Sequence, residues 1–465
     1  MKRFIFACVG AAVGTAVLLG SPSEARANGR FPESNQLLFD KNDPQLVILR
    51  VTFGLLVSHD RGATFDWICE QSIGYSSVED PMYATTPSGR FVGTTFQGMV
   101  STPDQGCNWK FVGDDTREIF VDLTQNPNDG KNILTFSSGY TGADDAGNSL
   151  FESQVWETKD EGKTFSKLGK PLEQRLLGYT IDVTKTDENR IYITAVRDRG
   201  KAGTALLLTS TDRGTTWNEQ QVPLIGTETS IWIAAVDPTD AEKVYIRTNN
   251  NPGSPGRLIL REKDPGDPTK GTLKTLFTSK APLDGFALSA DNKKIWVGSL
   301  LDGVWMASTD DYQFTQKSTT AVKCLAAADD GLWACSNEAA KPVGFIVGVS
   351  GDEGATFTPK AHFCSIRGAL ACSQGSTTSD LCDWRLMRET LGCDPITGTN
   401  PDGGFELDAS SFTSGGPGGG NGTTTTTKSC DCQSVLPTGG WSSAGGVAAS
   451  ILAAALAVAR RRRRR

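Results

Sequence analysis

An eight-residue segment recurs six times along this chain, and its spacing constrains the fold more than any other feature. Each copy has Ser or Thr, then Asp two residues later, then in most copies a Gly and a closing Phe or Trp. The Asp residues of the six copies are Asp60, Asp104, Asp160, Asp212, Asp310 and Asp352. They are separated by 44, 56, 52, 98 and 42 residues. Because the longest separation is close to two periods, we expect a further unit near residues 256–261 that has lost the segment.

Each copy has the composition of a tight hairpin turn. The Asp and Ser or Thr side chains are suited to accept hydrogen bonds from backbone N–H groups of their own turn. The Gly supplies a positive φ, and the aromatic residue packs beneath the turn. Short stretches with strand patterning flank the copies, separated by Asp, Asn, Pro and Gly. The segment therefore predicts a structural staple and not a catalytic group.

The segment resembles the Asp-box, or BNR repeat, of the sialidase-like and sortilin-like superfamily. Repetition of the segment with its flanking strands predicts an all-β fold, a seven-bladed β-propeller with four strands in each blade. We expect the blades to start near residues 35, 77, 118, 177, 230, 283 and 321. Six or eight blades remain alternatives because the fifth unit lacks the segment.

The N-terminus reads as an export signal. Lys2 and Arg3 precede an apolar run, and Ala25-Arg26-Ala27 is a small-residue cleavage site. Residues 1–27 therefore predict a secretory signal peptide, with a membrane anchor as the alternative. We expect the propeller at 28–361, a Cys-rich cap segment at 362–410 and a disordered linker rich in Gly, Ser and Thr at 411–429.

Residues 430–465 have the composition of a targeting segment. Cys430 and Cys432 precede an uncharged stretch at 439–459 that is long enough to span a bilayer as a helix, and six Arg end the chain. This order resembles the MYXO-CTERM sorting signal of myxobacterial surface proteins. The resemblance implies cleavage by a sorting protease, with Cys430 or Cys432 as a lipid-attachment or processing residue, and membrane attachment through the helix or a lipid. A simple tail anchor, with a Cys430–Cys432 disulfide or free thiols, is the alternative.

Cysteine usage agrees with export to the cell envelope or cell surface. Eight cysteines remain when Cys8 and the two C-terminal ones are set aside, and their even number predicts up to four disulfides. These eight are Cys69, Cys107, Cys324, Cys335, Cys364, Cys372, Cys382 and Cys393.

The positions of these cysteines suggest some pairings. Cys324 and Cys335 flank a hairpin turn and suit a cross-strand bridge, whereas Cys69 and Cys107 are expected at the outer edges of blades one and two, which they could join. The last four predict a disulfide-tied cap with a short helix at residues 380–391. A zinc site is the alternative for these four, although their spacing lacks the CxxC pattern.

Composition removes several function classes. His59 and His362 are the only histidines, so a multi-histidine metal cluster cannot form, and a Ser-His-Asp or Cys-His triad would need one of them. The formal net charge of −7 includes the six C-terminal Arg, so the body of the chain is more acidic than that total and disfavours nucleic acid. We predict no catalytic residue, no metal and no cofactor.

Ligand recognition is predicted on the face opposite the repeated turns. Loops between second and third strands are long in three consecutive blades, at residues 136–154, 196–203 and 249–256. Their polar candidates are Tyr140, Asp144, Asp145, Arg197, Arg199, Lys201 and Asn250. The alternatives are surface insertions without a role and a calcium site at 144–148, which lacks the spaced carboxylates of known calcium loops.

The sialidase resemblance implies a test for glycoside hydrolysis. Neither Arg50 on its strand nor Arg30 before the first blade lies in an Arg-Ile-Pro motif, and no tyrosine lies in a recognisable catalytic context. A carboxylate pair at glycosidase distance stays open. Sortilin-type ectodomains and photosystem II assembly factors, which have the same architecture, bind proteins or peptides without chemistry.

We therefore predict an exported cell-surface propeller, anchored through its C-terminus, that binds an unknown protein or glycan without catalysis. The alternatives are an exo-sialidase-like glycoside hydrolase with an Arg and carboxylate site on the channel face, and a purely structural coat component.

Overall fold

The structure is a computed structural model that describes residues 32–75, 79–114, 116–199, 203–250, 254–266, 271–338 and 343–393. The predicted signal peptide, the linker, the C-terminal sorting signal with Cys430 and Cys432, and the binding candidate Lys201 lie outside the described residues. Within those ranges, no helix combines the length and apolar character needed to cross a membrane.

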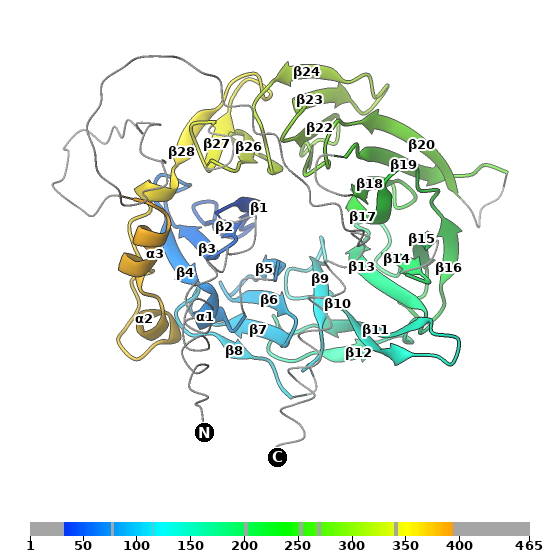
Figure 1. The fold of residues 1–465 in the computed structure, drawn as a ribbon, viewed down its shortest axis with the longest axis horizontal. Helices are drawn as coiled ribbons and strands as arrows, with labels where there is room; N and C mark the ends of the chain where they lie inside the picture. Colours follow the sequence, from blue (N-terminus) through cyan, green and yellow to red (C-terminus); the bar gives the residue numbers. More distant parts are fainter. Residues whose placement is uncertain are drawn as a thin grey trace, which may run out of the picture. The chain divides into compact units, whose positions relative to one another are not determined.

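Seven four-stranded antiparallel sheets form a ring in the described part of the chain, so the predicted seven-bladed β-propeller is confirmed (Figure 1). Each blade consists of four consecutive strands. Blades 1 to 4 contain β1 (Ser34–Phe39), β2 (Val47–Val51), β3 (Gly54–Ser58), β4 (Asp66–Cys69), β5 (Tyr83–Thr85), β6 (Phe91–Thr95), β7 (Gly98–Thr102), β8 (Lys110–Phe111), β9 (Phe120–Gln125), β10 (Ile133–Ala143), β11 (Ser149–Thr158), β12 (Ser166–Leu168), β13 (Leu176–Val183), β14 (Ile191–Arg197), β15 (Thr204–Ser210) and β16 (Asn218–Gln221).

Blades 5 to 7 contain β17 (Glu228–Val236), β18 (Val244–Asn250), β19 (Arg257–Lys263), β20 (Gly271–Thr278), β21 (Gly285–Leu288), β22 (Lys294–Ser299), β23 (Gly303–Ser308), β24 (Thr315–Ser318), β25 (Cys324–Ala328), β26 (Gly331–Cys335), β27 (Val347–Ser350) and β28 (Thr358–Ala361). The expected blade starts agree with the first strands except in blade 2. There β5 begins at Tyr83 rather than near residue 77, because helix α1 (Glu70–Ile73) occupies the preceding link.

The hydrophobic core lies between neighbouring blades. One cluster joins Leu134 and Phe136 of β10 to Ile181 of β13 and to Ile191 and Ile193 of β14, so it spans blades 3 and 4. Middle strands such as Val47–Val51 are buried along their whole length. This burial on both faces explains why they read as continuous apolar runs rather than alternating ones.

The repeated segments form the turns between the third and fourth strands, here called the repeat turns. In blade 3, Asp160 accepts hydrogen bonds from the Thr158 and Thr164 hydroxyls and from the backbone N–H of Lys163 and Thr164, at 2.6–3.0 Å. Asp60, Asp104, Asp212 and Asp352 accept equivalent bonds in blades 1, 2, 4 and 7. Gly162 has φ 75°, and a Cβ there would lie 2.4 Å from Val92 in the preceding blade. The turns therefore also pack blade against blade.

The turn at Asp310 differs from the other five. The Asp310 backbone N–H donates to Ser308 Oγ at 3.1 Å, but in the described residues its carboxylate accepts no hydrogen bond. Asp311 instead accepts from the Gln313 N–H at 3.0 Å. The predicted staple role of Asp310 is therefore wrong. Tyr312 takes the place of the Gly, and the segment is one residue shorter than the other copies, which displaces the donors.

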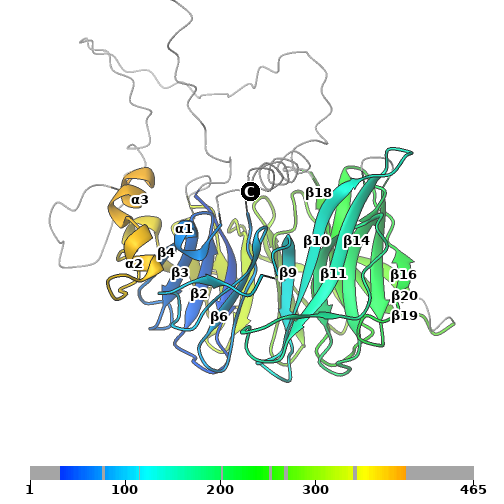
Figure 2. The ribbon, with the colours of Figure 1, turned by 90° about the horizontal axis from the view of Figure 1, so that it is seen from below.

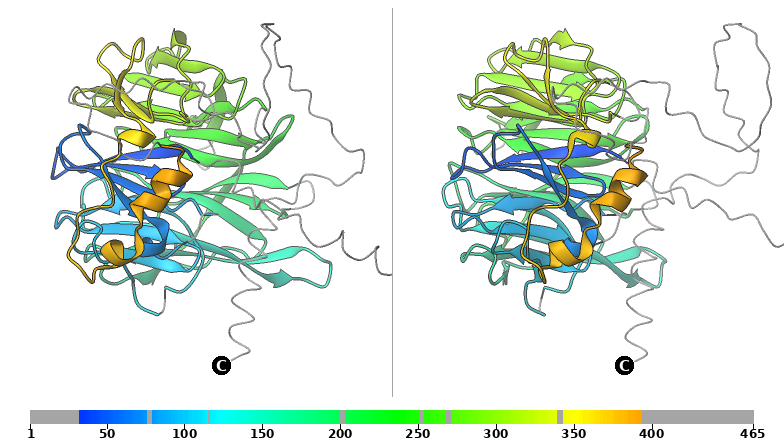
Figure 3. Two further views of the ribbon diagram at one scale, coloured as in Figure 1. Left: turned by 60° about the vertical axis from the view of Figure 1, so that its left-hand side comes forward. Right: turned by 90° about the vertical axis from the view of Figure 1, so that its left-hand side faces the viewer.

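Blades 1 and 7 exchange no strand, so the ring is closed in another way. Residues 362–393, here called the clasp, leave blade 7 after β28 and run along β4, the outermost strand of blade 1 (Figure 3). The Trp67 N–H donates to the Gly368 carbonyl at 2.7 Å, and the Leu370 N–H donates to the Trp67 carbonyl at 2.8 Å. The clasp continues as a 3₁₀ turn (Phe363–Ser365) and helices α2 (Thr377–Leu381) and α3 (Trp384–Thr390), which lie outside blades 1 and 2.

Three disulfides hold the clasp. Cys69 of blade 1 pairs with Cys382, Cys107 of blade 2 pairs with Cys372, and Cys364 pairs with Cys393 within the clasp. The suggested link between Cys69 and Cys107 is therefore wrong, because the clasp passes both blade edges and supplies each with its own partner. The zinc alternative is also wrong, since all four clasp sulfurs are in disulfides. Cys324 and Cys335 join β25 to β26 as predicted.

The predicted helix at 380–391 is interrupted. α2 ends at Leu381, and α3 begins after Asp383, whose side chain accepts from the Leu386 N–H. Cys382 lies between the two helices, and its disulfide to Cys69 fixes the chain there.

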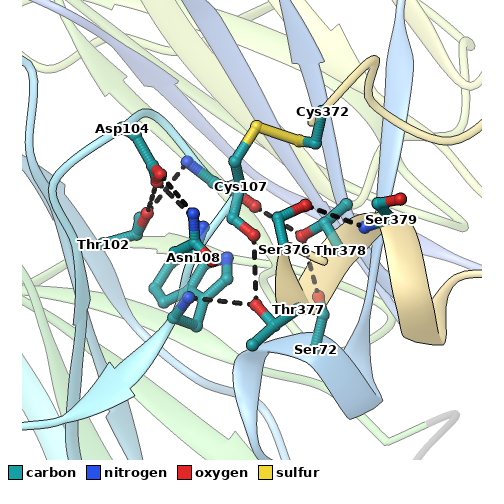
Figure 4. Close-up of a disulfide and its surroundings, with 12 residues drawn as sticks. Ser72, Thr102, Asp104, Cys107, Asn108, Cys372, Ser376, Thr377, Thr378 and Ser379 are labelled. Atoms are coloured by element: carbon teal, nitrogen blue, oxygen red, sulfur yellow. Dashed lines mark hydrogen bonds between the residues drawn. A yellow bond between two sulfur atoms is a disulfide. The ribbon is translucent and has the colours of Figure 1, made fainter. Parts of the chain in front are cut away.

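Hydrogen bonds reinforce the second disulfide (Figure 4). The Thr377 hydroxyl and the Thr378 N–H both donate to the Cys107 carbonyl at 3.1 Å. The Thr378 hydroxyl donates to the Gly106 carbonyl at 2.5 Å and lies 3.3 Å from the Ser72 hydroxyl of α1. The clasp is therefore bound to the repeat turn of blade 2 through its backbone as well as through sulfur.

Replacing Asp160 with Ala should lower the free energy of unfolding by about 1–2 kcal/mol, because several hydrogen bonds within one turn are lost together. Asp310→Ala is the matched control and should change stability little, since its carboxylate accepts no hydrogen bond in the described residues. Chemical denaturation monitored by tryptophan fluorescence measures both. Equal losses in the two variants would contradict the staple assignment.

Removing both disulfides between clasp and blades, by changing Cys69, Cys107, Cys372 and Cys382 to Ser, should destabilise the ring by more than about 5 kcal/mol. The loops that these bridges close span 313 and 265 residues, and long loops restrict the unfolded chain most. Removing Cys324–Cys335, which closes only 11 residues, should cost about 3 kcal/mol. Urea unfolding distinguishes the two, and a larger loss for the short loop would count against closure by the clasp.

Candidate functional site

Strand alternation assigns the loops to two faces of the ring. The blade-to-blade links and the loops between second and third strands lie on one face, here called the link face, and the repeat turns lie on the other. Figure 2 shows α1, a link helix, on the same side as the tip of the β10–β11 hairpin. Ligands of propellers with this topology are sought on the link face.

Two arginines, the buried Arg50 and the half-buried Arg247, join successive blades at the link face. Arg50 on β2 donates from Nη1 to two backbone carbonyls just before β5, at 2.9 and 3.0 Å. Arg247 occupies the same position on β18 and donates from Nη1 to the two carbonyls just before β21, both at 3.1 Å. Arg247 also lies 4.9 Å from the ring centroid of Trp232. Both guanidinium groups are therefore engaged by the architecture of the ring.

Two carboxyl groups, on the buried Asp122 and the half-buried Asp182, join the inner strands of blades 3 and 4. Asp122 on β9 accepts from the Ile181 N–H of β13 at 2.8 Å, and the Thr124 hydroxyl donates to Asp182 of β13 at 2.8 Å. Burial raises the pKa of Asp122 to about 7 and that of Asp182 to about 6. The partners are backbone and hydroxyl groups of the protein itself, so these acids act between blades.

A second pair of buried acids lies in the link between blades 1 and 2. Glu70 begins α1, and Glu79 precedes β5, where its carboxylate accepts from the Phe96 N–H at 2.8 Å. Burial raises the pKa of each to about 7, and the Glu79 charge adds to the shift of Glu70. In the described residues, Glu70 Oε1 is buried without a hydrogen-bond partner. Glu70 therefore has a carboxyl oxygen that no other described residue engages.

The predicted loop at 136–154 is mostly strand, which corrects that expectation. β10 and β11 continue as a long hairpin, and only residues 144–148 form the turn. Tyr140 packs edge-on against Phe151 with ring centroids 6.0 Å apart. Asp144 accepts from the backbone of Ala146 and Asn148 and from the Asn148 side chain, at 2.7–3.0 Å, so it closes the turn. Asp145 is exposed at the tip.

The remaining binding candidates are engaged by their own blades. Arg197 forms ion pairs with Glu173 and Glu219 at 2.8 and 2.7 Å. The Arg199 guanidinium donates to the Tyr179 hydroxyl. Asn250 donates to the Ser254 carbonyl at 3.1 Å, and its Oδ1 is buried without a partner in the described residues.

These candidates do not form one cluster. Tyr140, Asp144 and Asp145 lie on blade 3, Arg197 and Arg199 on blade 4, and Asn250 on blade 5.

No hydrolytic triad forms around the second histidine in the described residues. His362 Nδ1 pairs with Glu338, which raises the pKa of the imidazole. The Ser365 hydroxyl donates to the His362 backbone carbonyl, not to the ring. Among the described residues, no three His, Cys, Asp or Glu side chains are placed to hold a metal ion.

Sequence reasoning missed the residues that organise the link face. Arg50 and Arg247 stand at the same place in VILRV and VYIRT, so alignment of the second strands would have found them. Glu70 and Glu79 carry no such signal, because they lie in a link whose course depends on α1 and on the disulfide next to it.

Comparisons with known proteins show similarity in structure only. No protein-family model and no curated protein matches the chain. Among solved structures, it is similar to Saccharomyces cerevisiae Sqt1 (14% identity, 70% of this chain and 88% of that chain, TM-score 0.43) and to a putative 6-phosphogluconolactonase from Bacteroides uniformis (12%, 60% and 82%, 0.38). It is also similar to a GH74 enzyme from Niastella koreensis (12%, 70% and 71%, 0.31). At these identities and TM-scores the likeness says nothing about activity or ligand.

Glu70→Gln should weaken the pH dependence of stability. The fold raises the Glu70 pKa from 4.5 to about 7, so between these values the folded state binds more protons than the unfolded state. Stability is therefore lost as pH rises through this window, by about 1–2 kcal/mol, less than the full shift implies because water screens part of the group. Gln cannot ionise and should abolish this contribution.

Thermal denaturation at pH 5 and pH 8 measures the effect. Glu152→Gln, at an exposed position of β11, is the control and should keep the wild-type pH dependence. An unchanged pH dependence in Glu70→Gln would contradict burial of that carboxyl group.

Proposed function

We propose that this chain is an exported Asp-box propeller that recognises a protein or glycan at the cell surface and performs no chemistry on it. The observation that carries the proposal is that the protein itself engages the guanidinium groups of Arg50 and Arg247. A sialidase-like site needs arginines that are free to hold a substrate carboxylate, whereas both of these donate to backbone carbonyls of the next blade. We therefore assign ligand recognition to the loops that the rigid ring carries.

The blade 3 hairpin and the adjoining edge of blade 4 form the proposed recognition surface. Phe151 of the hairpin donates its backbone N–H to the Gln174 carbonyl at 2.7 Å, so the hairpin is fixed to the link that follows it. Tyr140 is half-buried and presents an aromatic face, and Asp145 is exposed. An aromatic group beside polar groups on a rigid support suits both sugars and peptides.

Export is supported by the four disulfides, since such bridges persist in oxidising compartments. The proposal includes the N-terminal signal peptide and the MYXO-CTERM-like tail. A sorting protease would process this tail near Cys430 or Cys432, and the chain would be held at the envelope through its C-terminus.

A glycoside hydrolase is the second candidate, and one observation favours it. Glu70 and Glu79 both have a pKa raised to about 7, and a carboxyl group that stays protonated near neutral pH is what a general acid requires. A second carboxyl group nearby is the other requirement of glycoside hydrolysis. Their burial, at 7% and 8% exposed, argues against direct access of a substrate.

A glycan and peptide array, run beside a panel of fluorogenic sialosides and other glycosides, separates the two candidates. We expect binding without turnover. Tyr140→Ala and Asp145→Asn should each weaken binding about tenfold or more, because such contacts are worth about 1.4 kcal/mol or more. Asp329→Asn, in the turn between β25 and β26, is the control and should bind as the wild type does. Turnover that is lost in Glu70→Gln or Glu79→Gln would establish the hydrolase instead.

A further inference from the structure

A pocket of about 430 Å³ lies on the outer half of blade 2, away from the link face. Arg90 directly precedes β6, Ser101 lies on β7, and Lys110 lies on β8, so the pocket spans three strands beside the repeat turn of this blade. Pro103, Asp104 and Asn108 of that turn complete the lining. Figure 4 shows Asp104 and Asn108 next to the disulfide that binds blade 2 to the clasp.

Two cations, Arg90 and Lys110, line this pocket beside Ser101. Arg90 Nη1 donates to Ser101 Oγ at 3.3 Å, and Lys110 stands opposite Ser101 in the pairing of β7 with β8. Arg90 Nε is buried and lacks a hydrogen-bond partner in the described residues. Neither Arg90 nor Lys110 takes part in an ion pair with any described carboxylate. Because Ser101 Oγ accepts from Arg90, its O–H remains available as a donor.

Three other blades carry a basic residue at the position of Arg90. The residue just before the second strand is also basic in blades 4 and 5, where a carboxylate neutralises it: Arg190 pairs with Glu242 at 2.6 Å and Lys243 with Glu262 at 3.5 Å. In blade 6 this residue is Lys293, which is exposed to solvent. In blade 3, Glu157 occupies the place that Ser101 has in blade 2, since Ile133 faces Thr158 as Phe91 faces Thr102. Blade 2 therefore has the basic residue of blades 4 and 5 without their ion pair, and a hydroxyl where blade 3 has an acid.

Asp104 is the one carboxylate in the lining, and its oxygens are already engaged. Its Oδ1 accepts from the Thr102 hydroxyl and the Asn108 N–H, and its Oδ2 accepts from the Asn108 side chain, at 2.6–2.9 Å. Two cations against this one anion leave a net positive charge at the Arg90 end of the pocket.

We propose that blade 2 holds an acidic sugar residue whose carboxylate or sulfate group binds Arg90, Lys110 and the Ser101 hydroxyl. Guanidinium and ammonium groups bind these oxyanions directly, and Arg does so with two parallel hydrogen bonds. The pocket is larger than an oxyanion needs and has the size of small-molecule sites, so it also accommodates the sugar ring against Pro103 and Asn108. This site goes beyond the proposed function, because it lies outside the link-face recognition surface.

Isothermal titration of the full-length chain tests the site with glucuronic acid, glucose 6-sulfate, glucose, sodium sulfate and N-acetylaspartate amide at constant ionic strength. We expect binding of glucuronic acid or glucose 6-sulfate, at least tenfold tighter than that of glucose, sulfate or the aspartate derivative. Comparing the two acidic sugars tells a carboxylate ligand from a sulfate ligand. Binding of sulfate alone, or of the aspartate derivative as tightly as either sugar, would overturn the assignment to a sugar.

Three variants test the residues. Lys110→Gln, at an exposed position, should weaken binding at least tenfold, and Arg90→Gln should do the same. Ser101→Glu should abolish binding while the ring stays folded, because it restores the acid that blade 3 has at this place. Lys293→Gln, an equal loss of charge at an exposed position of blade 6, should bind as the wild type does. Undiminished binding in Lys110→Gln and Ser101→Glu would overturn the proposal.

Discussion

Closure of the ring between blades 7 and 1 is the constraint on which the other features depend. The core lies between blades, so every blade needs a neighbour on both sides, yet the first and last blades share no strand. Side chains make the direct contact: Ser34 Oγ donates to carbonyls of blade 7, and Arg61 pairs with Asp330 beside Phe39 and Trp333. The clasp then converts this contact into a covalent closure through its disulfides to blades 1 and 2.

The need to hold neighbouring blades together also explains the roles of the charged residues on the link face. Each blade must hold the next one at its inner strands, and Asp122, Asp182, Arg50 and Arg247 do so with hydrogen bonds to the backbone or hydroxyls of a neighbouring blade. A side chain that holds two blades together has little freedom to bind a ligand. Arginines and buried acids on this face are therefore weak evidence of catalysis.

The sequence predicted the fold better than the site, for physical reasons. A repeat turn such as that of Asp160 is local, so its residues lie next to each other and reveal both the turn and the blade period. Disulfide pairing depends on where the clasp passes, which no local pattern encodes, and so the pairing of Cys69 was missed. Residues 136–154 were predicted as a loop because they are rich in Ser, Gly and Thr, although most of them lie on the paired strands β10 and β11.

Because the blade is repeated, each blade can be compared with the others in the same molecule. The seven blades pack against their neighbours in the same way. Where several blades carry a basic residue at one position, its partners in the other blades show which contacts it makes when its role is only structural. In blades 4 and 5 the basic residue forms an ion pair with a carboxylate. Blade 2 has this basic residue, Arg90, without an ion pair among the described residues, and a pocket lies beside it and Ser101. It departs from blades 4 and 5 in a way that packing does not require. Such departures, rather than charged residues as such, indicate where a propeller of this kind binds its ligands.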